Sequence, residues 1–275
     1  MSNSPKFSVL IASFNSAEFI AGAINSVLSQ DYKHYEIVIV DDCSEDDSLD
    51  IIKELKSDKI KVFRNKENFG TGYTKRKCVE ESSGEIFCFL DSDDELASNA
   101  LSLMVKCHLE NSLCSLVYSN YYDCNSALRI IKKNIRKSAG SSRSHLEVGK
   151  ISHLVSCKRR FYDKTEGINP ALKRAQDHDL YYKMEEVGEI RYINEFLYFY
   201  RMHKNSASRG SLDARLLSRL WHFRAMEAAY NRRGLDQSEL EYRFLEMVKD
   251  AIKKHSYTKV LVRRIREILA CALMK

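Results

Sequence analysis

The sequence is poor in residues that break a chain, with only 2 prolines and 10 glycines among 275 residues. This scarcity argues against a long disordered linker, because such segments are rich in proline, glycine and other small polar residues. No apolar run approaches the roughly 18 residues of a membrane-spanning helix. The first six residues are polar, so we expect no secretory signal. A chain of this length has room for one sizeable domain, or for one domain and an appendage.

Paired cysteines and a strong charge excess are also missing. None of the eight cysteines forms a C-x-x-C pair, which disfavours a zinc site. Several of them lie in apolar runs and are expected to be small core residues, in keeping with a reducing cytoplasm. The net charge of +6 suits an anionic ligand or surface. It does not indicate nucleic acid, since no aromatic and basic RNA-binding motif accompanies it.

The strongest chemical signal that is present is the run Asp91-Ser92-Asp93-Asp94. It directly follows an apolar segment, Ile86 to Leu90, with the length and composition of a buried strand. Three carboxylates at a strand exit repel one another and lose hydration unless a positive charge lies among them. A divalent cation with oxygen ligands meets that need. If the cation also carries a phosphate-bearing substrate, the chain is an enzyme of phosphate-ester chemistry.

The first 65 residues or so predict alternating strands and helices, and therefore a parallel sheet with helices on its faces. We expect strands at Phe7 to Ala12, Glu36 to Val40 and Ile60 to Phe63, with helices at 19–28 and Ser48 to Leu55. Asn15 and Glu18 have the spacing of a capping box for the first helix. Such sheets bind ligands beyond the carboxyl ends of their strands. The polar residues there, at 13–15, 41–42, 65–68 and 91–94, are expected to meet in one crevice.

The remaining sequence predicts further helices and strands around a basic, irregular stretch. Helices are expected at Thr74 to Glu81, Asn99 to Glu110 and Asp177 to Val187, and strands at Ser115 to Ser119 and Tyr192 to Tyr200. We interpret residues 123–150 as a solvated surface or mobile loop, with contact to an anionic substrate as the alternative. From residue 211 onward the pattern is helical only, and three interpretations stay open: packing on the sheet domain, a homodimer interface, or peripheral contact with an anionic membrane.

Once these elements are placed, the motifs resemble those of the family 2 glycosyltransferases, whose fold is GT-A. The resemblance covers about Phe7 to Ser208, and the motifs follow the order found in the family. Besides the acidic run they are Ser8–Asn15, Val38–Ser44, Asn68–Lys75, Gln176–Leu180 and Tyr198–Ser206. The resemblance implies an α/β, Rossmann-like domain with a mostly parallel central sheet over residues 1–210, followed by a helical appendage over 211–275.

The resemblance also implies which residues hold a nucleotide. Ser13 and Asn15, at the end of the first strand, would hold the base. Asp42 would accept a hydrogen bond from a uracil N–H, which favours UDP. Asp91 would bind the ribose hydroxyls. Lys75 is carried over to the nucleotide-sugar site, where it keeps the charge of the family's usual arginine without its bidentate fork.

A metal-bound diphosphate is the next implication of the resemblance. Asp93 would bind a Mn²⁺ or Mg²⁺ ion that bridges the two phosphates of the donor, and Asp94 would support this site. The ion would offset charge on the departing nucleoside diphosphate. Arg201 and His203 are candidates for the diphosphate, because a planar guanidinium matches phosphate oxygens.

The implied reaction needs a general base, and the resemblance assigns this role to Asp177, with Asp179 in support. The acceptor hydroxyl has a very high pKa, so its proton must leave as the oxygen attacks. One displacement would invert the anomeric centre of the sugar. The implied enzyme is an inverting, metal-dependent glycosyltransferase of the hexosyltransferase type. We expect it in the cytoplasm, with a glycan or lipid-linked acceptor, in surface polysaccharide or glycolipid synthesis.

The sequence departs from the family pattern at a few positions. Gln176 stands where an acidic residue precedes the base, so the base assignment depends on Asp177 alone. Arg76 replaces the usual asparagine after Lys75, and Ser98 replaces a common proline. None of these changes removes a residue that the chemistry requires.

Two other functions remain open on sequence grounds. Haloacid-dehalogenase-like phosphatases also place D-x-D after a strand, although Glu95 occupies a position where threonine or valine would follow. A non-catalytic nucleotide-binding protein is the second alternative, and the joint presence of Asp91, Asp93 and Asp177 argues against it. Each aspartate by itself is also explained as a helix cap or turn residue.

Overall fold

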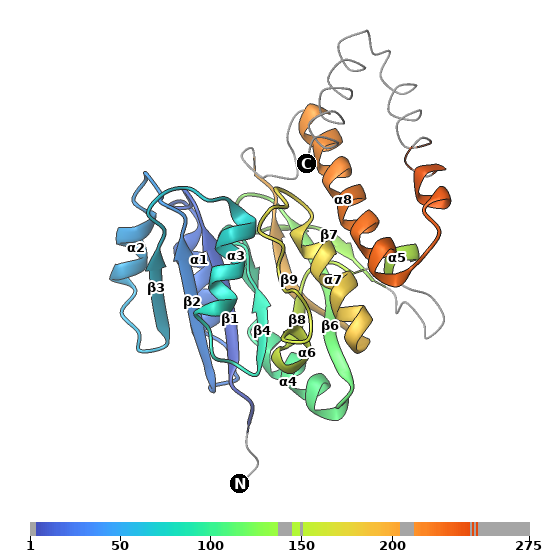
Figure 1. Ribbon diagram of the computed structural model, residues 1–275. Coiled ribbons are helices and arrows are strands. Elements are labelled where there is room, and N and C mark those ends of the chain that lie inside the picture. The colour runs from blue at the N-terminus through green and yellow to red at the C-terminus, as the bar shows by residue number, and fades with distance from the viewer. Residues whose placement is uncertain are drawn as a thin grey trace. The chain divides into compact units, whose positions relative to one another are not determined.

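The computed structural model describes residues 4–136, 145–148, 151–203, 212–242, 244 and 246. The chain divides into two compact units, Met1–Ala229 and Tyr230–Lys275. Among the described residues, all strands lie in the first unit, where nine of them form one mixed sheet (Figure 1). The predicted division at residue 210 is not tested by this observation and stays a prediction.

The first part of the sheet is parallel, as the alternating pattern predicts. It consists of β1 (Phe7–Ser13), β2 (Tyr35–Asp41), β3 (Ile60–Arg64) and β4 (Ile86–Phe89), in the spatial order β3-β2-β1-β4. The helices between these strands are α1 (Ile20–Leu28), α2 (Ser48–Glu54) and α3 (Thr71–Glu80). β1 and β2 are almost wholly buried, which explains their continuous apolar sequences.

The second part of the sheet mixes directions and continues from β4. Its strands are β5 (Glu95–Leu96), β6 (Cys114–Cys124), β7 (Ile130–Asn134), β8 (Val155–Lys158) and β9 (Glu189–Arg201). β8 lies antiparallel between β4 and β6, while β9 runs parallel to β6. The helices of this part are α4 (Ala100–Glu110), α5 (His145–Val148), α6 (Arg159–Tyr162), α7 (Gln176–Val187) and α8 (Leu212–Arg233).

Each face of the sheet packs against helices through a cluster of buried apolar residues. Val9 and Ile11 of β1 face the layer that contains α1 and α4, whereas Leu10 faces the layer that contains α3 and α7. The alternation follows from the two-residue period of a strand, and it places helices on both faces. This three-layer arrangement brings the carboxyl ends of β1, β2 and β4 to one edge, near the start of α7 (Figure 1).

The capping box predicted for the first helix is wrong. α1 begins at Ile20 without a side-chain cap, after a turn in which the Ser16 carbonyl accepts the N–H groups of Phe19 and Ile20. Asn15 has a left-handed backbone (φ 48°), and its side-chain oxygen accepts the Glu45 N–H instead. A tertiary contact between two loops has therefore replaced the local cap.

The interpretation of residues 123–150 as wholly irregular is also wrong, because β7 lies within it and pairs with β6. Its sequence, Ile130-Ile131-Lys132-Lys133-Asn134, does not alternate, so strand pairing overrides the local pattern. The part of the predicted helical appendage that follows residue 246 lies outside the described residues. No helix in the described part of the chain is long and apolar enough to cross a bilayer.

Candidate functional site

A small cavity of about 50 Å³ lies beyond the end of β4. Four acidic or basic residues contribute to its wall: Lys75 of α3, Asp91 after β4, His153 before β8 and Asp177 of α7. They come from four segments between positions 75 and 177, which the crossovers of the sheet bring together. The lining also contains the aromatic residues Phe87, Phe89, Tyr181 and Tyr198. The fold therefore gathers three of the predicted site residues around one space.

Lys75 and Asp91 form an ion pair in this cavity, with 3.1 Å between Nζ and Oδ1. The Lys75 ammonium is the main cause that lowers the pKa of Asp91, against the effect of burial. Burial by itself would lower the pKa of Lys75, but Asp91 and Asp177 reverse this, and the pKa of the lysine is raised. Both groups are therefore charged at neutral pH.

Asp177 is the second residue of α7, whose N-terminus favours a negative charge. Burial raises the pKa of Asp177, but His178, Lys75 and His153 act in the other direction, and the net pKa lies below its ordinary value. The carboxylate is therefore ionised at neutral pH and able to accept a proton. Asp179, on the same helix, is buried and forms a 2.8 Å ion pair with Lys183.

The turn after Asp91 carries a second group of polar contacts. Asp93 Oδ2 lies 2.8 Å from His203 Nε2. Asp94 is fully buried and accepts hydrogen bonds from the Tyr198 hydroxyl (2.7 Å) and the Arg201 N–H (2.6 Å). Burial first, and then the charges of Asp91 and Asp93, raise the pKa of Asp94 well above its ordinary value. Asp94 thus holds the turn in place, consistent with a supporting role.

Arg201 uses its guanidinium within the chain. It donates to the Asp93 carbonyl (2.6 Å), the Ser126 carbonyl (2.6 Å) and Glu95 Oε1 (3.1 Å). The guanidinium also lies over the ring of Phe19, 4.8 Å from its centre. These contacts fasten the end of β9 to the acidic turn and to the turn between β6 and β7. The contact of Arg201 with a diphosphate stays a prediction.

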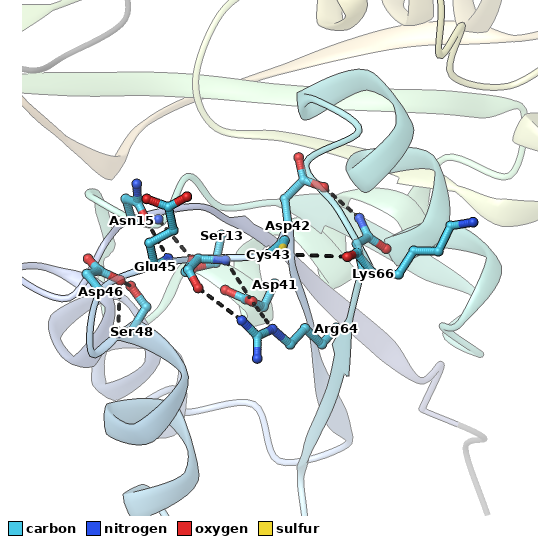
Figure 2. Close-up of polar contacts among 12 residues, drawn as sticks. Ser13, Asn15, Asp41, Asp42, Cys43, Glu45, Asp46, Ser48, Arg64 and Lys66 are labelled. Atoms are coloured by element: carbon cyan, nitrogen blue, oxygen red, sulfur yellow. Dashed lines mark hydrogen bonds and ion pairs between the residues drawn. The ribbon is translucent and has the colours of Figure 1, made fainter.

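The other predicted residues form a separate group at the ends of β1 and β2 (Figure 2). Ser13 Oγ lies 2.7 Å from Ser16 Oγ, and Asn15 joins the loop after β1 to the loop after β2. Asp42 is buried, and both of its oxygens accept hydrogen bonds within the chain. The donors are the Asn65 amide and the N–H groups of Phe69 and Gly70.

The neighbouring Asp41 differs from Asp42 in its bonding. Its Oδ2 accepts the Ser44 N–H and lies 3.3 Å from Arg64 Nε (Figure 2). Its Oδ1 is buried and has no hydrogen-bond partner. A buried carboxylate oxygen without a donor is costly, so it marks a place where a ligand N–H or a water molecule completes the site. The resemblance assigns the uracil contact to Asp42, whereas the oxygen without a partner belongs to Asp41.

The acidic turn at residues 91–94 offers few protein ligands for a divalent cation. In the part of the chain that is described, no three His, Cys, Asp or Glu side chains gather closely enough to hold a metal alone. Asp93 and His203 nevertheless supply an oxygen and a nitrogen ligand 2.8 Å apart, and Asp91 adds negative charge nearby. This set fits Mn²⁺ or Mg²⁺ when ligand phosphates fill the other positions.

His153 is a cavity residue that the sequence motifs miss. Its ring stacks between Tyr198 (4.8 Å) and Tyr200 (5.1 Å), which come from β9. Burial lowers the pKa of His153 more than Asp91 and Asp177 raise it, so the ring is neutral at pH 7. No motif surrounds this histidine in the sequence, so only the fold reveals it. Its stacking partner Tyr198 also donates a hydrogen bond to Asp94.

A family comparison agrees with this geometry. The sequence model described as glycosyl transferase family 2 matches residues 8–167, more than half of the chain. The match includes the strands β1, β2 and β4 and the acidic turn.

Named relatives extend the similarity along the chain. A putative teichuronic acid biosynthesis glycosyltransferase of Bacillus subtilis is 27% identical over 257 residues, 91% of this chain and 97% of that protein. A UDP-Glc:alpha-D-GlcNAc-diphosphoundecaprenol beta-1,3-glucosyltransferase of Escherichia coli is 29% identical over 206 residues, 73% of this chain and 79% of that one. Chondroitin synthase of Escherichia coli is 27% identical over 84% of this chain, but the match spans only 33% of that much longer protein.

Solved structures support the fold. TarS of S. aureus in complex with UDP-GlcNAc aligns with a TM-score of 0.69 at 19% identity, over 90% of this chain and 73% of that one. A mannosyltransferase of Pyrobaculum calidifontis in complex with GDP-Man and Mn²⁺ aligns with a TM-score of 0.61 at 15% identity, over 100% and 82% of the two chains. The predicted fold class is confirmed by these neighbours. The family match, over more than half of its length, establishes that this chain belongs to glycosyl transferase family 2.

Proposed function

We propose that this chain is an inverting, metal-dependent glycosyltransferase that moves a sugar from a UDP-sugar to a hydroxyl acceptor. The observation that carries the proposal is the cavity where the ionised Asp177 faces the Lys75–Asp91 ion pair. A transferase needs a base for the acceptor hydroxyl and charged groups for the donor phosphates. The cavity has a candidate for each role, Asp177 for the base and the Lys75–Asp91 pair for the charged groups. Family membership supplies the reaction class.

Asp177 is the proposed general base. The acceptor oxygen forms a bond to the anomeric carbon as the bond from that carbon to the diphosphate oxygen breaks. The proton of the acceptor hydroxyl moves to the Asp177 carboxylate, whose lowered pKa keeps it ready at neutral pH. The displaced nucleoside diphosphate carries away the electron pair. A single displacement of this kind inverts the anomeric centre and needs no covalent sugar–enzyme intermediate.

The donor would lie along the carboxyl ends of the strands. Ser13, Asn15 and Asp42 are the proposed nucleotide residues at one end, and Asp91 is proposed for the ribose. Asp42 also shapes the loop at Phe69 and Gly70, because the N–H groups of both residues bond to its oxygens.

Asp93 and His203 would hold a Mn²⁺ or Mg²⁺ ion, which supplies Lewis-acid stabilisation of the diphosphate when bound. Asp94, hydrogen-bonded to Tyr198 and the Arg201 N–H, keeps Asp93 oriented. Arg201 reaches the same turn through the Asp93 carbonyl, and its predicted contact with the diphosphate remains part of the proposal. Lys75 adds a buried cation next to the developing negative charge.

The acceptor is proposed from the relatives. One of them is named for a diphosphoundecaprenol acceptor and another for teichuronic acid synthesis. We therefore propose a glycan or lipid-linked acceptor in surface polysaccharide or glycolipid synthesis. The phosphatase alternative gains no support, because the acidic turn lies inside the region that matches glycosyl transferase family 2.

A thermal-shift and donor-hydrolysis screen tests the proposal. We expect UDP and Mn²⁺ together to stabilise the protein more than either one alone, and at least one UDP-sugar to be hydrolysed slowly without acceptor. Stabilisation by metal and inorganic phosphate alone, with no effect of any nucleotide, would support the phosphatase instead. A crystal with UDP and Mn²⁺ bound far from Asp93 would contradict the proposed site.

A further inference from the structure

The hairpin of β6 and β7 presents an unusual surface. Three isoleucines, Ile130, Ile131 and Ile135, are 51%, 59% and 65% exposed. Three cationic side chains, Arg129, Lys132 and Lys133, are exposed beside them. No acidic residue occurs between Asn125 and Arg136. We call these six residues the β7 surface. Large aliphatic side chains grouped with cations on an exposed strand are rarely left in water without a partner.

The position of β7 in the sheet leaves this surface open. β7 pairs with β6 and lies off the main path of the sheet, so it has one strand neighbour among those described (Figure 1). The register shifts between Asp123 and Cys124, which leaves Ile131 without a counterpart on β6. Such a bulge at a sheet edge twists the strand and turns it away from further pairing.

The hairpin is nevertheless held against β9 by aromatic contacts on the face that carries Lys133. Tyr122, opposite Lys133, stacks on Phe196 (4.6 Å) and Phe199 (5.2 Å) of β9. The Lys133 ammonium lies 5.7 Å above the Phe196 ring. At the turn, the Ser126 carbonyl accepts a hydrogen bond from Arg201. The β7 surface is therefore a preformed part of the domain, attached through Arg201 to the acidic turn.

A partner of the β7 surface has to satisfy both its cations and its isoleucines. A second copy paired along β7 would bring Lys132 and Lys133 of both chains together, and the like charges would repel. An anionic polysaccharide would satisfy the cations but would give the three isoleucines nothing apolar to contact. An anionic bilayer satisfies both, because its headgroups attract cations and its acyl boundary accepts aliphatic side chains.

We propose that the β7 surface docks on the anionic face of a lipid bilayer, with Arg129, Lys132 and Lys133 on the headgroups and the isoleucines in the acyl boundary. Docking at this hairpin would hold the acidic turn close to the membrane plane. For sugar transfer, this consequence depends on the proposed function with a lipid-linked acceptor. The binding itself does not, because it needs neither donor nor acceptor.

Vesicle co-sedimentation of the full chain tests the proposal. We expect wild type to bind vesicles that contain phosphatidylglycerol and not vesicles of phosphatidylcholine alone. Lys132→Glu with Lys133→Glu should weaken binding by about 30-fold or more, since each lost cation is worth roughly fivefold. Lys53→Glu with Lys56→Glu, an equal change of charge at exposed positions in α2 and just after it, should leave binding unchanged.

The isoleucines are tested separately from the charges. Ile130→Ser with Ile131→Ser should weaken binding by about tenfold or more, through lost apolar contact. The matched control is Leu109→Ser with Leu113→Ser, which removes two leucines that are 62% and 63% exposed elsewhere. The control should bind vesicles as wild type does. Thermal unfolding of each variant checks that the hairpin itself is intact.

Several outcomes would overturn the proposal. Equal binding to both kinds of vesicle, or full binding by the Lys132 and Lys133 variant, would show that the β7 surface is not used. Loss of binding only in Arg263→Glu with Arg264→Glu would assign it to the C-terminal sequence. A dimer that the isoleucine variant converts to a monomer, with vesicle binding unchanged, would favour pairing of two copies. Because no donor is present, none of these results bears on sugar transfer.

Discussion

The loops after β1 and β2 and the acidic cavity after β4 neutralise their carboxylates in different ways. Asp42 is surrounded by neutral donors, the Asn65 amide and two backbone N–H groups. In the cavity, Asp91 faces a lysine ammonium, and Asp177 lies at a helix N-terminus near the same ammonium. Neutral donors that saturate a carboxylate build a preformed loop. Charged partners leave a site whose electrostatics a proton or an anionic ligand is able to change.

The comparison teaches that similar motifs serve different purposes. Asp42 mainly holds its loop in place, and Asp41 is buried with one oxygen that has no hydrogen-bond partner. Neighbouring charges shift the pKa values of Asp91, Asp94 and Asp177. We therefore expect substitutions in the cavity to change rate and ligand affinity, and substitutions in the loops to change mainly stability.

The largest expected effect is that of Asp177→Asn. The amide keeps the size of the side chain but cannot accept the proton, so kcat should fall by roughly 10² to 10⁴-fold. UDP affinity, measured by calorimetry, should stay nearly unchanged. Asp163→Asn, an exposed aspartate of the same domain, is the control and should keep full activity. Sugar transfer by Asp177→Asn at the normal rate would refute the assignment of the base.

Asp93→Ala should have the next largest effect, on donor affinity. Removal of the proposed metal ligand should weaken Mn²⁺-dependent UDP binding on the order of 100-fold. Binding measured without metal should change little, and this difference separates a metal ligand from a general loss of structure. Asp58→Ala removes an exposed carboxylate and should have no effect. Retention of full metal dependence would place the ion elsewhere.

Arg201→Lys is expected to change stability, and it also tests whether this residue contributes to ligand affinity. A lysine replaces the fork that reaches three acceptors on separate segments, so the free energy of unfolding should fall by about 3 kcal/mol. Arg160→Lys, at an exposed site, should cost far less. If UDP affinity falls in Arg201→Lys under conditions where the variant is fully folded, the predicted diphosphate contact gains support. Unchanged affinity would leave Arg201 as a structural clamp.

Asp42→Asn tests the loop side of the comparison. The amide would place an NH₂ group against an N–H donor, so the free energy of unfolding should fall by about 2 kcal/mol. Activity at saturating donor should stay close to wild type. Urea unfolding and kcat measured on the same preparation check both parts. A large drop in kcat with unchanged stability would move Asp42 into the group of chemically active carboxylates.

The smallest expected effect is the change of kcat with pH. The pKa of Asp177 lies below its ordinary 3.8, and that of Lys75 lies above its ordinary 10.5. Asp177 takes up a proton only in acid, and Lys75 loses one only in alkali. Between about pH 6 and pH 9, kcat should therefore vary by less than about twofold. A change of kcat with pH near 6.5 in wild type that is absent from His153→Gln would contradict the neutral state inferred for this ring.

The parallel half of the fold was predictable because its signals are local. Buried strands such as Phe7–Ser13 and Tyr35–Asp41 are continuous apolar runs, and each is followed by polar residues. The acidic turn was found for the same reason, since its residues are adjacent in sequence. The second half was harder to predict, since β5, β7 and β8 are short and depend on partners far along the chain.

The sequence alone determined the fold class, the family and the identities of the acidic residues, because apolar periodicity and short motifs are enough to predict them. Only the tertiary structure decided which of them meet. It placed Lys75, Asp91 and Asp177 around one cavity, added His153, and used the guanidinium of Arg201 within the chain. The physical reason is that ion pairs and hydrogen bonds depend on distances of about 3 Å, which the packing of distant segments sets.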